Sequence, residues 1–248
     1  MKYLEYKLKS SEHLVAPIGD LHLGSKGCDV ELLKKQLKKI HDNKSDIIFM
    51  GDMIENATKV SPGNGVYKQI MSPMEQIEEI IKLFKPVKKQ IVMGVTGNHC
   101  IRASDSSGID LMQVIMDGLD AGDKYVGYTG ICEFKNNDEN YKIYAWHGAG
   151  GGATIQGALR PLYKQAEWLD ADVMLMGHTH HLFNDTVVMR KVVDGKFRDY
   201  LKHFVITGSF MKWDEEYPEM KGYRPMLLGS PLIHLNGKKH EIGVDLEW

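Results

Sequence analysis

The chain of 248 residues carries 31 Lys and Arg against 33 Asp and Glu, which gives a formal net charge of -2. With 43% hydrophobic and 26% charged residues, its composition excludes a disordered chain, a collagen and a coiled coil. The near-neutral charge also argues against a protein that coats nucleic acid chiefly by neutralising phosphates, although a local basic patch is compatible with it.

The cysteines and the N-terminal segment bear on the compartment. Cys28, Cys100 and Cys132 are odd in number and widely spaced, which argues against a disulfide framework. The first twelve residues mix lysines with glutamates and lack the apolar core of a signal peptide. No apolar run approaches the roughly 20 residues that span a bilayer. We therefore expect a soluble, reduced protein of the cytoplasm with no membrane partner.

Short apolar runs alternate with segments of helical periodicity, as in α/β proteins. Six runs predict strands, at 14–18, 46–50, 90–95, 141–146, 172–176 and 203–207. Each of these runs ends in glycine or polar residues. Since open α/β sheets bind their ligands beyond the carboxyl ends of the strands, these junctions are the candidate site.

Helices are predicted between the strands. Asp29 is a candidate N-cap for a helix that begins at Val30, and Ser72-Pro73-Met74-Glu75 has the pattern of a capping box. Weaker patterns cover 110–119 and 154–169, and Pro161 predicts a kink or a later start in the second.

The segment 208–248 has a different character, because it is rich in aromatic residues and proline. We expect an irregular cover over the domain, followed by strands at 231–235 and 241–246, with Asn236-Gly237 as a hairpin signal. Residues 1–248 are expected to form a single domain. Ser209 and Tyr223 could reach a substrate, but packing is the favoured interpretation.

Potential metal ligands follow five of the strands. The motifs are Asp20-Leu21-His22, Gly51-Asp52, Gly97-Asn98-His99, His147-Gly148 and Gly177-His178-Thr179-His180. Imidazole, carboxylate and amide groups that converge from different elements suit divalent transition metals. The remaining histidines are interpreted as structural: His13, His41, His181, His203, His234 and His240.

This ordered series of motifs resembles the calcineurin-like metallophosphoesterase family over residues 14–180 and the strands that follow. The resemblance implies two packed mixed β-sheets flanked by helices, an αββα sandwich, and hydrolysis of phosphate esters at a dinuclear metal centre. It implies the following ligands: Asp20, His22 and His180 for one metal, Asn98, His147 and His178 for the second, and Asp52 as the bridge. Two such cations lower the pKa of a shared water, so that hydroxide attacks phosphorus.

The resemblance also suggests catalytic and substrate-binding residues. His99 is the candidate general acid for the leaving oxygen. Glu55 stands where the family has a shorter aspartate, and it could orient His99 with an adjusted rotamer. Asn98 is a candidate substrate contact as well as a ligand. Arg102 does not come from the resemblance: it lies three residues after His99 and could clamp a substrate phosphate in bidentate fashion, with an ordinary surface arginine as the alternative.

We expect a metal-dependent phosphoesterase, and specifically a phosphodiesterase that acts on a nucleotide or a nucleic-acid end. A general acid helps most when the leaving group is a poor alkoxide, which favours the diester. Two alternatives stay open: a phosphomonoesterase for small molecules or proteins, and a non-catalytic metal-binding scaffold. The mixed N and O ligands favour Mn, with Fe, Zn or Ni as alternatives.

Overall fold

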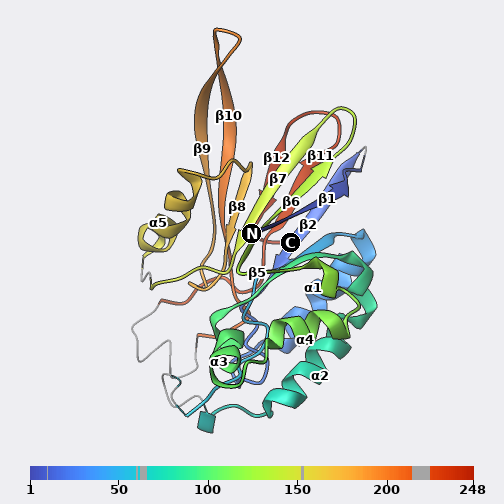
Figure 1. The fold of residues 1–248 in the computed structure, drawn as a ribbon, viewed down its shortest axis with the longest axis vertical. Coiled ribbons are helices and arrows are strands. Elements are labelled where there is room, and N and C mark those ends of the chain that lie inside the picture. Colours follow the sequence, from blue (N-terminus) through green and yellow to red (C-terminus); the bar gives the residue numbers. More distant parts are fainter. Residues whose placement is uncertain (10, 60, 62–65, 152–153, 214–223) are drawn as a thin grey trace.

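The computed structural model describes residues 1–9, 11–59, 61, 66–151, 154–213 and 224–248. These residues form two mixed sheets of six strands each, flanked by helices (Figure 1). The strand orders are β12-β11-β2-β3-β4-β5 and β1-β6-β7-β8-β10-β9. The predicted α/β sandwich of two packed mixed sheets is therefore confirmed.

The first sheet has a parallel half and an antiparallel half. The parallel strands are β2 (Glu12–Ile18), β3 (Asp46–Phe49), β4 (Ile91–Val95) and β5 (Tyr125–Gly127), and the antiparallel strands are β11 (Leu232–Asn236) and β12 (Ile242–Asp245). The helices packed on its outer face are α1 (Val30–Asn43), α2 (Pro73–Phe84) and α4 (Leu111–Gly118). The predicted Ser72–Glu75 capping box is present at the start of α2.

The second sheet is covered by a single helix on its outer face. Its strands are β1 (Lys2–Lys7), β6 (Thr129–Lys135), β7 (Asn140–Trp146), β8 (Val173–Met176), β9 (Leu182–Val193) and β10 (Lys196–Thr207). The covering helix is α5 (Ile155–Ala166), which packs through Leu159 and Leu162 against Met174 and Phe204. The shorter helices are α3 (Asn98–Ser107), η2 (Lys85–Gln90) and η3 (Gly122–Lys124).

The main apolar core lies between the two sheets. Val15, Ile48 and Val92 of the first sheet pack with side chains of the second, including Phe134 and Leu175. Because successive side chains of a strand point to opposite faces, each central strand also contributes to an outer core under the helices. The sandwich is thus a rigid support for the residues that follow its strands.

Strands β9 and β10 extend well beyond the rest of their sheet (Figure 1). The pairing of β10 with β8 begins at His203, whereas the pairing of β10 with β9 continues to Lys196 and Val193. The two-residue turn Asp194-Gly195 has positive φ at both positions, as a tight hairpin requires. We call residues 187–202, the projecting part of this hairpin, the arm.

Several sequence predictions can be compared with these elements. The six predicted strands and the C-terminal hairpin are present, but residues 237–241 connect β11 to β12 in place of a two-residue turn. Pro161 lies inside α5, which begins at Ile155 behind the cap Thr154, so the predicted later start is wrong. The Thr154 side chain accepts from the Gly157 backbone and stabilises the earlier start.

Among the residues described, no helix is long and apolar enough to cross a membrane.

Candidate metal centre

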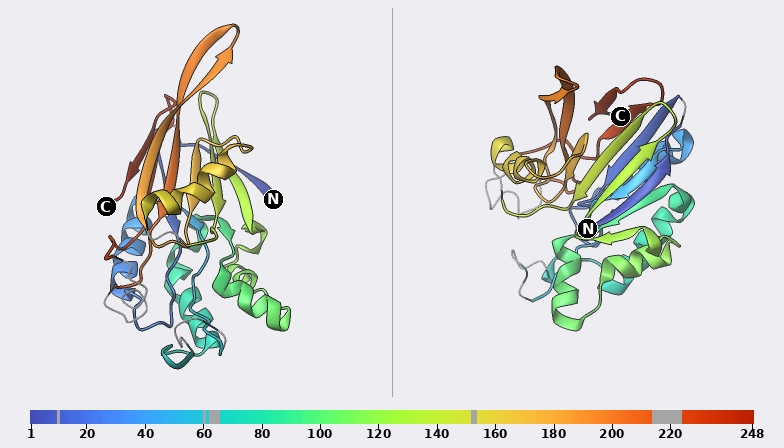
Figure 2. Two further views of the ribbon diagram at one scale, coloured as in Figure 1. Left: turned by 90° about the vertical axis from the view of Figure 1, so that its left-hand side faces the viewer. Right: turned by 45° about the horizontal axis from the view of Figure 1, so that its top comes forward.

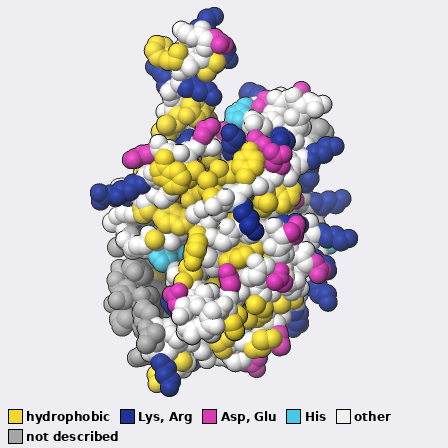
Figure 3. Space-filling view, in the orientation of Figure 1, with side chains coloured by type: hydrophobic (Ala, Val, Ile, Leu, Met, Phe, Trp, Pro, Cys, Tyr) yellow, Lys and Arg dark blue, Asp and Glu magenta, His cyan; other side chains and the backbone are white. Residues whose placement is uncertain are grey.

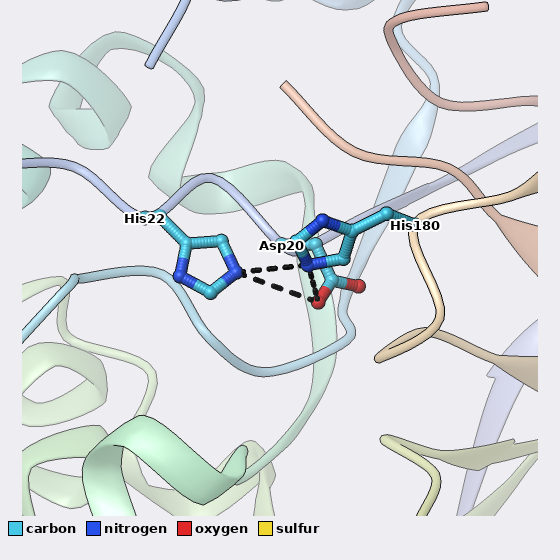
Figure 4. Close-up of side chains that lie close together, drawn as sticks. All are labelled: Asp20, His22 and His180. Carbon is cyan, nitrogen blue, oxygen red and sulfur yellow. Dashed lines mark hydrogen bonds and ion pairs between the residues drawn. The ribbon is translucent and has the colours of Figure 1, made fainter. Parts of the chain in front are cut away.

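The predicted ligands converge at the carboxyl ends of β2, β3, β4, β7 and β8. A first cluster consists of Asp20, His22 and His180 (Figure 4). The Nε2 atoms of His22 and His180 lie 3.1 Å apart, and Asp20 Oδ1 lies 3.4 Å from His180 Nε2 and 3.9 Å from His22 Nε2. Two imidazoles and a carboxylate thus point at one location.

A second cluster contains Asp52, His147 and His178, with Asn98 between the two imidazoles. The amide oxygen Oδ1 of Asn98 lies 3.1 Å from His147 Nε2 and 2.8 Å from His178 Nδ1. The imidazole of His147 is oriented by a hydrogen bond on the side away from the cluster, because its Nδ1 donates to the carbonyl of Met50 at 2.7 Å. Its Nε2 is therefore the atom that faces the cluster.

Asp52 connects the two clusters. Its Oδ2 lies 3.2 Å from His147 Nε2 in the second cluster and 4.0 Å from His22 Nε2 in the first. Its other oxygen, Oδ1, accepts from the His99 backbone at 2.9 Å, which holds the carboxylate plane. This is the position that a bridging ligand would occupy.

One buried carboxylate oxygen of the first cluster has no hydrogen-bond partner in the described chain. Asp20 is fully buried, and its Oδ1 makes no hydrogen bond within the described chain. Its Oδ2, by contrast, accepts from the His178 backbone at 2.9 Å. An unsatisfied buried carboxylate oxygen costs free energy, and the atoms that face it are the imidazole nitrogens His22 Nε2 and His180 Nε2. The residues present therefore fit a divalent cation.

The backbone is strained at the same place. Nine described residues other than glycine have positive φ, and five of them are the predicted ligands Asp20, His22, Asp52, His178 and His180. The left-handed region costs an L-residue roughly 1 kcal/mol or more, and Asp, Asn and His tolerate it best among bulky residues. Such strain is typical of functional sites.

Two glycines allow the backbone to approach the carboxylates. A Cβ atom on Gly97 would lie 2.1 Å from Asp52 Oδ1, and one on Gly177 would lie 2.5 Å from Asp20 Oδ2. Any side chain at either position would displace the carboxylate. The glycines of the G-N-H and G-H-T-H motifs are thus required for packing.

The structure changes the expectation for Glu55. Its carboxylate Oε2 lies 3.0 Å from His22 Nδ1, but 3.7 Å from His99 Nδ1. The contact that His99 Nδ1 makes is with the backbone carbonyl of Glu55. The extra methylene of glutamate carries the carboxylate past His99 to His22, so Glu55 orients a predicted metal ligand instead of the predicted acid.

His99 and Arg102 lie beside each other at the edge of the cluster. The two terminal guanidinium nitrogens of Arg102 lie 3.2 and 3.1 Å from His99 Nδ1 and Nε2, and Arg102 also donates to Ser61 Oγ at 3.2 Å. His99 Nε2 is 3.8 Å from Asp52 Oδ2. His22, Glu55 and His99 form a third group whose atoms are close enough to hold a cation.

Burial and neighbouring charges act in opposite directions on the pKa values of the site. Burial alone raises the pKa of Asp52, but the imidazoles of His147 and His99 hold it well below its usual value. Burial lowers the pKa of His147, yet the carboxylates of Asp52 and Asp20 raise it to about 9. For His99 burial prevails and lowers its pKa to about 4. Asp52 is therefore anionic and His99 neutral at pH 7.

The sequence reading missed some residues that position this site. Asn56 donates to the carbonyl of His99 at 2.7 Å, and Ser209 Oγ donates to the carbonyl of Asp20 at 2.9 Å. Ser209 is buried and acts on the ligand loop, in agreement with the favoured packing interpretation. Tyr223 lies outside the described residues. Asn56 has a positive φ and no motif around it in the sequence that could have revealed its role.

Comparisons with known proteins were made for sequence and structure. No protein-family model matches the sequence, and no curated protein matches it either. Among solved structures, a conserved uncharacterized protein of Streptococcus pneumoniae, a predicted phosphoesterase, shares 14% identity over 94% of this chain and 89% of its own, with a TM-score of 0.42.

Two further solved structures are similar at the same remote level. A Thermotoga maritima protein shares 17% identity over 95% of this chain and 98% of its own, with a TM-score of 0.38. GAP50, the anchor in the inner membrane complex of Plasmodium, shares 12% identity over 96% of this chain and 90% of its own, with a TM-score of 0.46. The function must therefore be inferred from the residues of the site.

Proposed function

We propose that this protein is a metal-dependent phosphoesterase, and specifically a phosphodiesterase that acts on a nucleotide or a nucleic-acid end. The observation that carries the proposal is the position of the Asp52 carboxylate. It lies within 4.0 Å of an imidazole nitrogen of each cluster, at the junction of two ligand sets. Histidines with a purely structural role would not require a carboxylate shared between two groups of imidazoles.

The ligand sets fit two cations. Asp20, His22 and His180 would hold one, and Asn98, His147 and His178 would hold the other, with Asp52 shared. Divalent cations in such a site supply Lewis acidity, which activates water and neutralises charge on the phosphoryl oxygens. Mn²⁺ is the proposed metal, and Fe, Zn and Ni are the alternatives that the same mixed N and O ligands suit.

The adjacent residues provide binding and proton transfer. The guanidinium of Arg102 is held by His99 and Ser61 and can bind two phosphate oxygens through its paired N–H groups. Because Nδ1 of His99 donates to the Glu55 carbonyl, Nε2 carries a lone pair in the neutral ring, so His99 must first take up a proton at Nε2 before it can pass one to the leaving oxygen. This step matters most for an alkoxide leaving group, which supports the preference for a diester.

The test compares two chromogenic substrates on chelator-stripped protein, before and after Mn²⁺ is restored. We expect turnover of bis-p-nitrophenyl phosphate to appear with Mn²⁺ and to exceed that of p-nitrophenyl phosphate. A preference for the monoester would replace the diester proposal with a phosphomonoesterase. No turnover of either, with metal shown to be bound, would leave a metal-binding scaffold.

The role of His99 has a separate test. His99→Ala should bind Mn²⁺ as the wild type does, and it should slow the hydrolysis of an alkyl ester by about 10² while slowing a p-nitrophenyl ester less. The p-nitrophenolate leaving group needs little protonation, so the ratio of the two rates reports the proton transfer. Loss of metal binding would identify His99 as a ligand instead.

A further inference from the structure

The arm projects from the rest of the molecule (Figures 1 and 3). It has two unlike faces, because its register places cross-strand neighbours on the same side. One face carries the pairs Val188–Leu201, Arg190–Asp199 and Val192–Phe197. On this face the single cation is neutralised, since Arg190 forms two hydrogen bonds with Asp199 at 2.6 and 2.8 Å.

The other face of the arm is basic and has no compensating acid. Lys191 lies directly opposite Arg198, and Lys196 belongs to the next pair toward the turn. All three side chains are exposed, and the eight arm residues on this face include no Asp or Glu. Like charges directly opposite each other destabilise a hairpin unless an anion lies between them. The positive charge of this face therefore suits the binding of an anionic ligand.

The basic face continues onto α5. Val187, on the same face of β9, packs against the core under α5, and Lys202 Nζ donates to the carbonyl of Leu169 just beyond the helix. Figure 2 (left) shows α5 lying across the sheet below the arm. The exposed side of α5 adds two cations, Arg160 and Lys164, four residues apart.

An aromatic side chain lies where the arm and α5 meet. Trp168 follows α5 immediately before Leu169, and 64% of it is exposed. The nearby acids include Glu167 and Asp170, which lies 3.7 Å from Lys142. Asp185, on the same face of β9 as Val187, accepts a hydrogen bond from Tyr163 of α5. An exposed indole between groups of cations is typical of surfaces that stack nucleobases while they bind the phosphate backbone.

This surface leads toward the metal centre. α5 begins shortly after the predicted ligand His147, and β9 begins two residues after His180. From Leu182 to Lys191 the strand extends about 30 Å, at roughly 3.3 Å per residue. A strand stacked as in a duplex advances about 3.4 Å per phosphate, so about nine nucleotides in that conformation would reach from the site to the arm, and fewer if the strand is extended.

A second copy of this chain is a less suitable occupant for the arm. A stable protein interface buries about 800 Å² on each partner, and the apolar face offers only four side chains on a narrow ribbon: Val188, Val192, Phe197 and Leu201. Moreover, the unpaired charges on the opposite face are all positive, so they would repel the same face of another copy. The charge of this surface is complementary to a polyanion.

We propose that the basic face of the arm, together with Trp168 and the exposed side of α5, binds a single strand of nucleic acid whose end reaches the metal centre. Lys191, Lys196 and Arg198 contact phosphates, and a base stacks on Trp168. The inference rests on the proposed function, because it identifies the polymer that the metal centre would cleave.

The experiment measures the binding of a fluorescein-labelled 12-nucleotide strand by anisotropy, with chelator present so that no turnover occurs. We expect the double variant Lys191→Gln/Arg198→Gln to bind about tenfold more weakly. The slope of log Kd against log salt should fall by about 1.4, for two lost phosphate contacts. Trp168→Ala should also weaken binding about tenfold at every salt concentration.

The matched control removes the same charge elsewhere. Lys35→Gln/Lys238→Gln changes two exposed lysines that lie off this surface, and it should bind as the wild type does. The neutral arm variant also removes the Lys191–Arg198 repulsion, so it should unfold at no lower urea concentration than the wild type, which excludes misfolding as the cause of weaker binding.

Equal affinity of the arm variant and the wild type would overturn the inference. The inference would also be overturned if the protein bound no strand at 50 mM salt and instead sedimented as a dimer that Phe197→Ser dissociates. The arm would then be a surface for self-association. A protein that binds the strand through the arm but hydrolyses no ester with Mn²⁺ would refute the proposed function alone.

Discussion

The two ends of the sandwich both bring histidines near acids, but they do so in different ways. At the amino ends of the parallel strands, three histidines contact carboxylates: His13 with Asp46 at 2.9 Å, His234 with Glu12 at 2.8 Å, and His240 with Glu139 at 3.2 Å. A fourth, His203, contacts the hydroxyl of Thr186, and its Nε2 has no hydrogen bond in the described chain. At the carboxyl ends, His22 and His180 face each other across 3.1 Å, and Asp20 Oδ1 has no hydrogen bond in the described chain.

The difference shows what distinguishes a ligand cluster from a structural one. Proximity of imidazole and carboxylate occurs at both ends, so it does not identify a metal site. At the carboxyl ends, one unsatisfied buried carboxylate oxygen, Asp20 Oδ1, coincides with left-handed backbone at Asp20, His22 and His180. The free energy lost there must be recovered by something the site binds.

Asp52→Asn should produce the largest effect. The amide keeps the acceptor that holds the His99 backbone but removes the negative charge shared by the two clusters. We expect kcat for bis-p-nitrophenyl phosphate to fall by about 10³ or more, with a normal circular dichroism spectrum. Asp46→Asn, at the opposite end, is the matched control and should retain full kcat. Activity in Asp52→Asn would refute the shared-ligand proposal.

Thermal unfolding with and without metal tests the comparison directly. Saturating Mn²⁺, at a hundred times its Kd, should stabilise the wild type by about 2.7 kcal/mol. For a chain of this size that corresponds to an increase in Tm of roughly 5–10 °C. His180→Ala should abolish the increase, whereas His240→Ala should keep it. If both variants respond as the wild type does, the two ends are equivalent and the metal proposal is wrong.

Glu55→Gln should have an intermediate effect. Because the Glu55 carboxylate lies 3.0 Å from His22 Nδ1, its loss should weaken Mn²⁺ binding by about 10- to 100-fold in a calorimetric titration. Glu75→Gln, an exposed capping residue of α2, should bind Mn²⁺ normally. Unchanged affinity together with a shifted pH-rate profile would instead assign Glu55 to His99.

The smallest effect is expected for a change at His240, which lies at the amino ends of the strands. Hydrogen bonds to Asp172 and Glu139 raise the pKa of His240 above its usual 6.5. The stabilisation of the folded protein by protonated His240 is therefore complete below about pH 6.5, and it is lost as the pH rises through the folded-state pKa of His240. His240→Gln should cost no more than about 1 kcal/mol at pH 6, because the half-exposed imidazole is screened, and less at pH 9. If His240→Gln lowered the free energy of unfolding in urea by the same amount at pH 6 and pH 9, this assignment would be contradicted.

The sequence carried enough information to predict where the candidate metal centre lies. Buried parallel strands are apolar throughout, so the polar residues after 18, 50, 95, 146 and 176 mark the strand ends. Parallel strands bring these ends to one edge, which is why the five junctions could be expected to form one site. The grouping of Asp20 with His180 as ligands of one metal came from the resemblance to the metallophosphoesterase family.

Other features depended on information that the sequence reading did not use or could not supply. The partner of Glu55 depends on its rotamer and on one methylene of length, neither of which a motif specifies. Strand β9 has mostly polar or exposed residues over its outer half and was not predicted, although Asp194-Gly195 is a strong hairpin signal. Helix α3 starts at the ligand Asn98 without a side-chain cap, so no start signal precedes it.

The position of β2 in its sheet has a consequence for the order of folding. β2 lies between β3 and β11, so Val15 is paired both with Asp46 and with Ile233, 218 positions further along the chain. The carbonyl of Asp20, at the end of β2, likewise accepts hydrogen bonds from Ser209 and Phe210. Contacts this distant in sequence require long loop closures and are typical of slow folding. We therefore expect the metal centre to be completed late, and refolding chains to regain their affinity for Mn²⁺ only in the slowest kinetic phase.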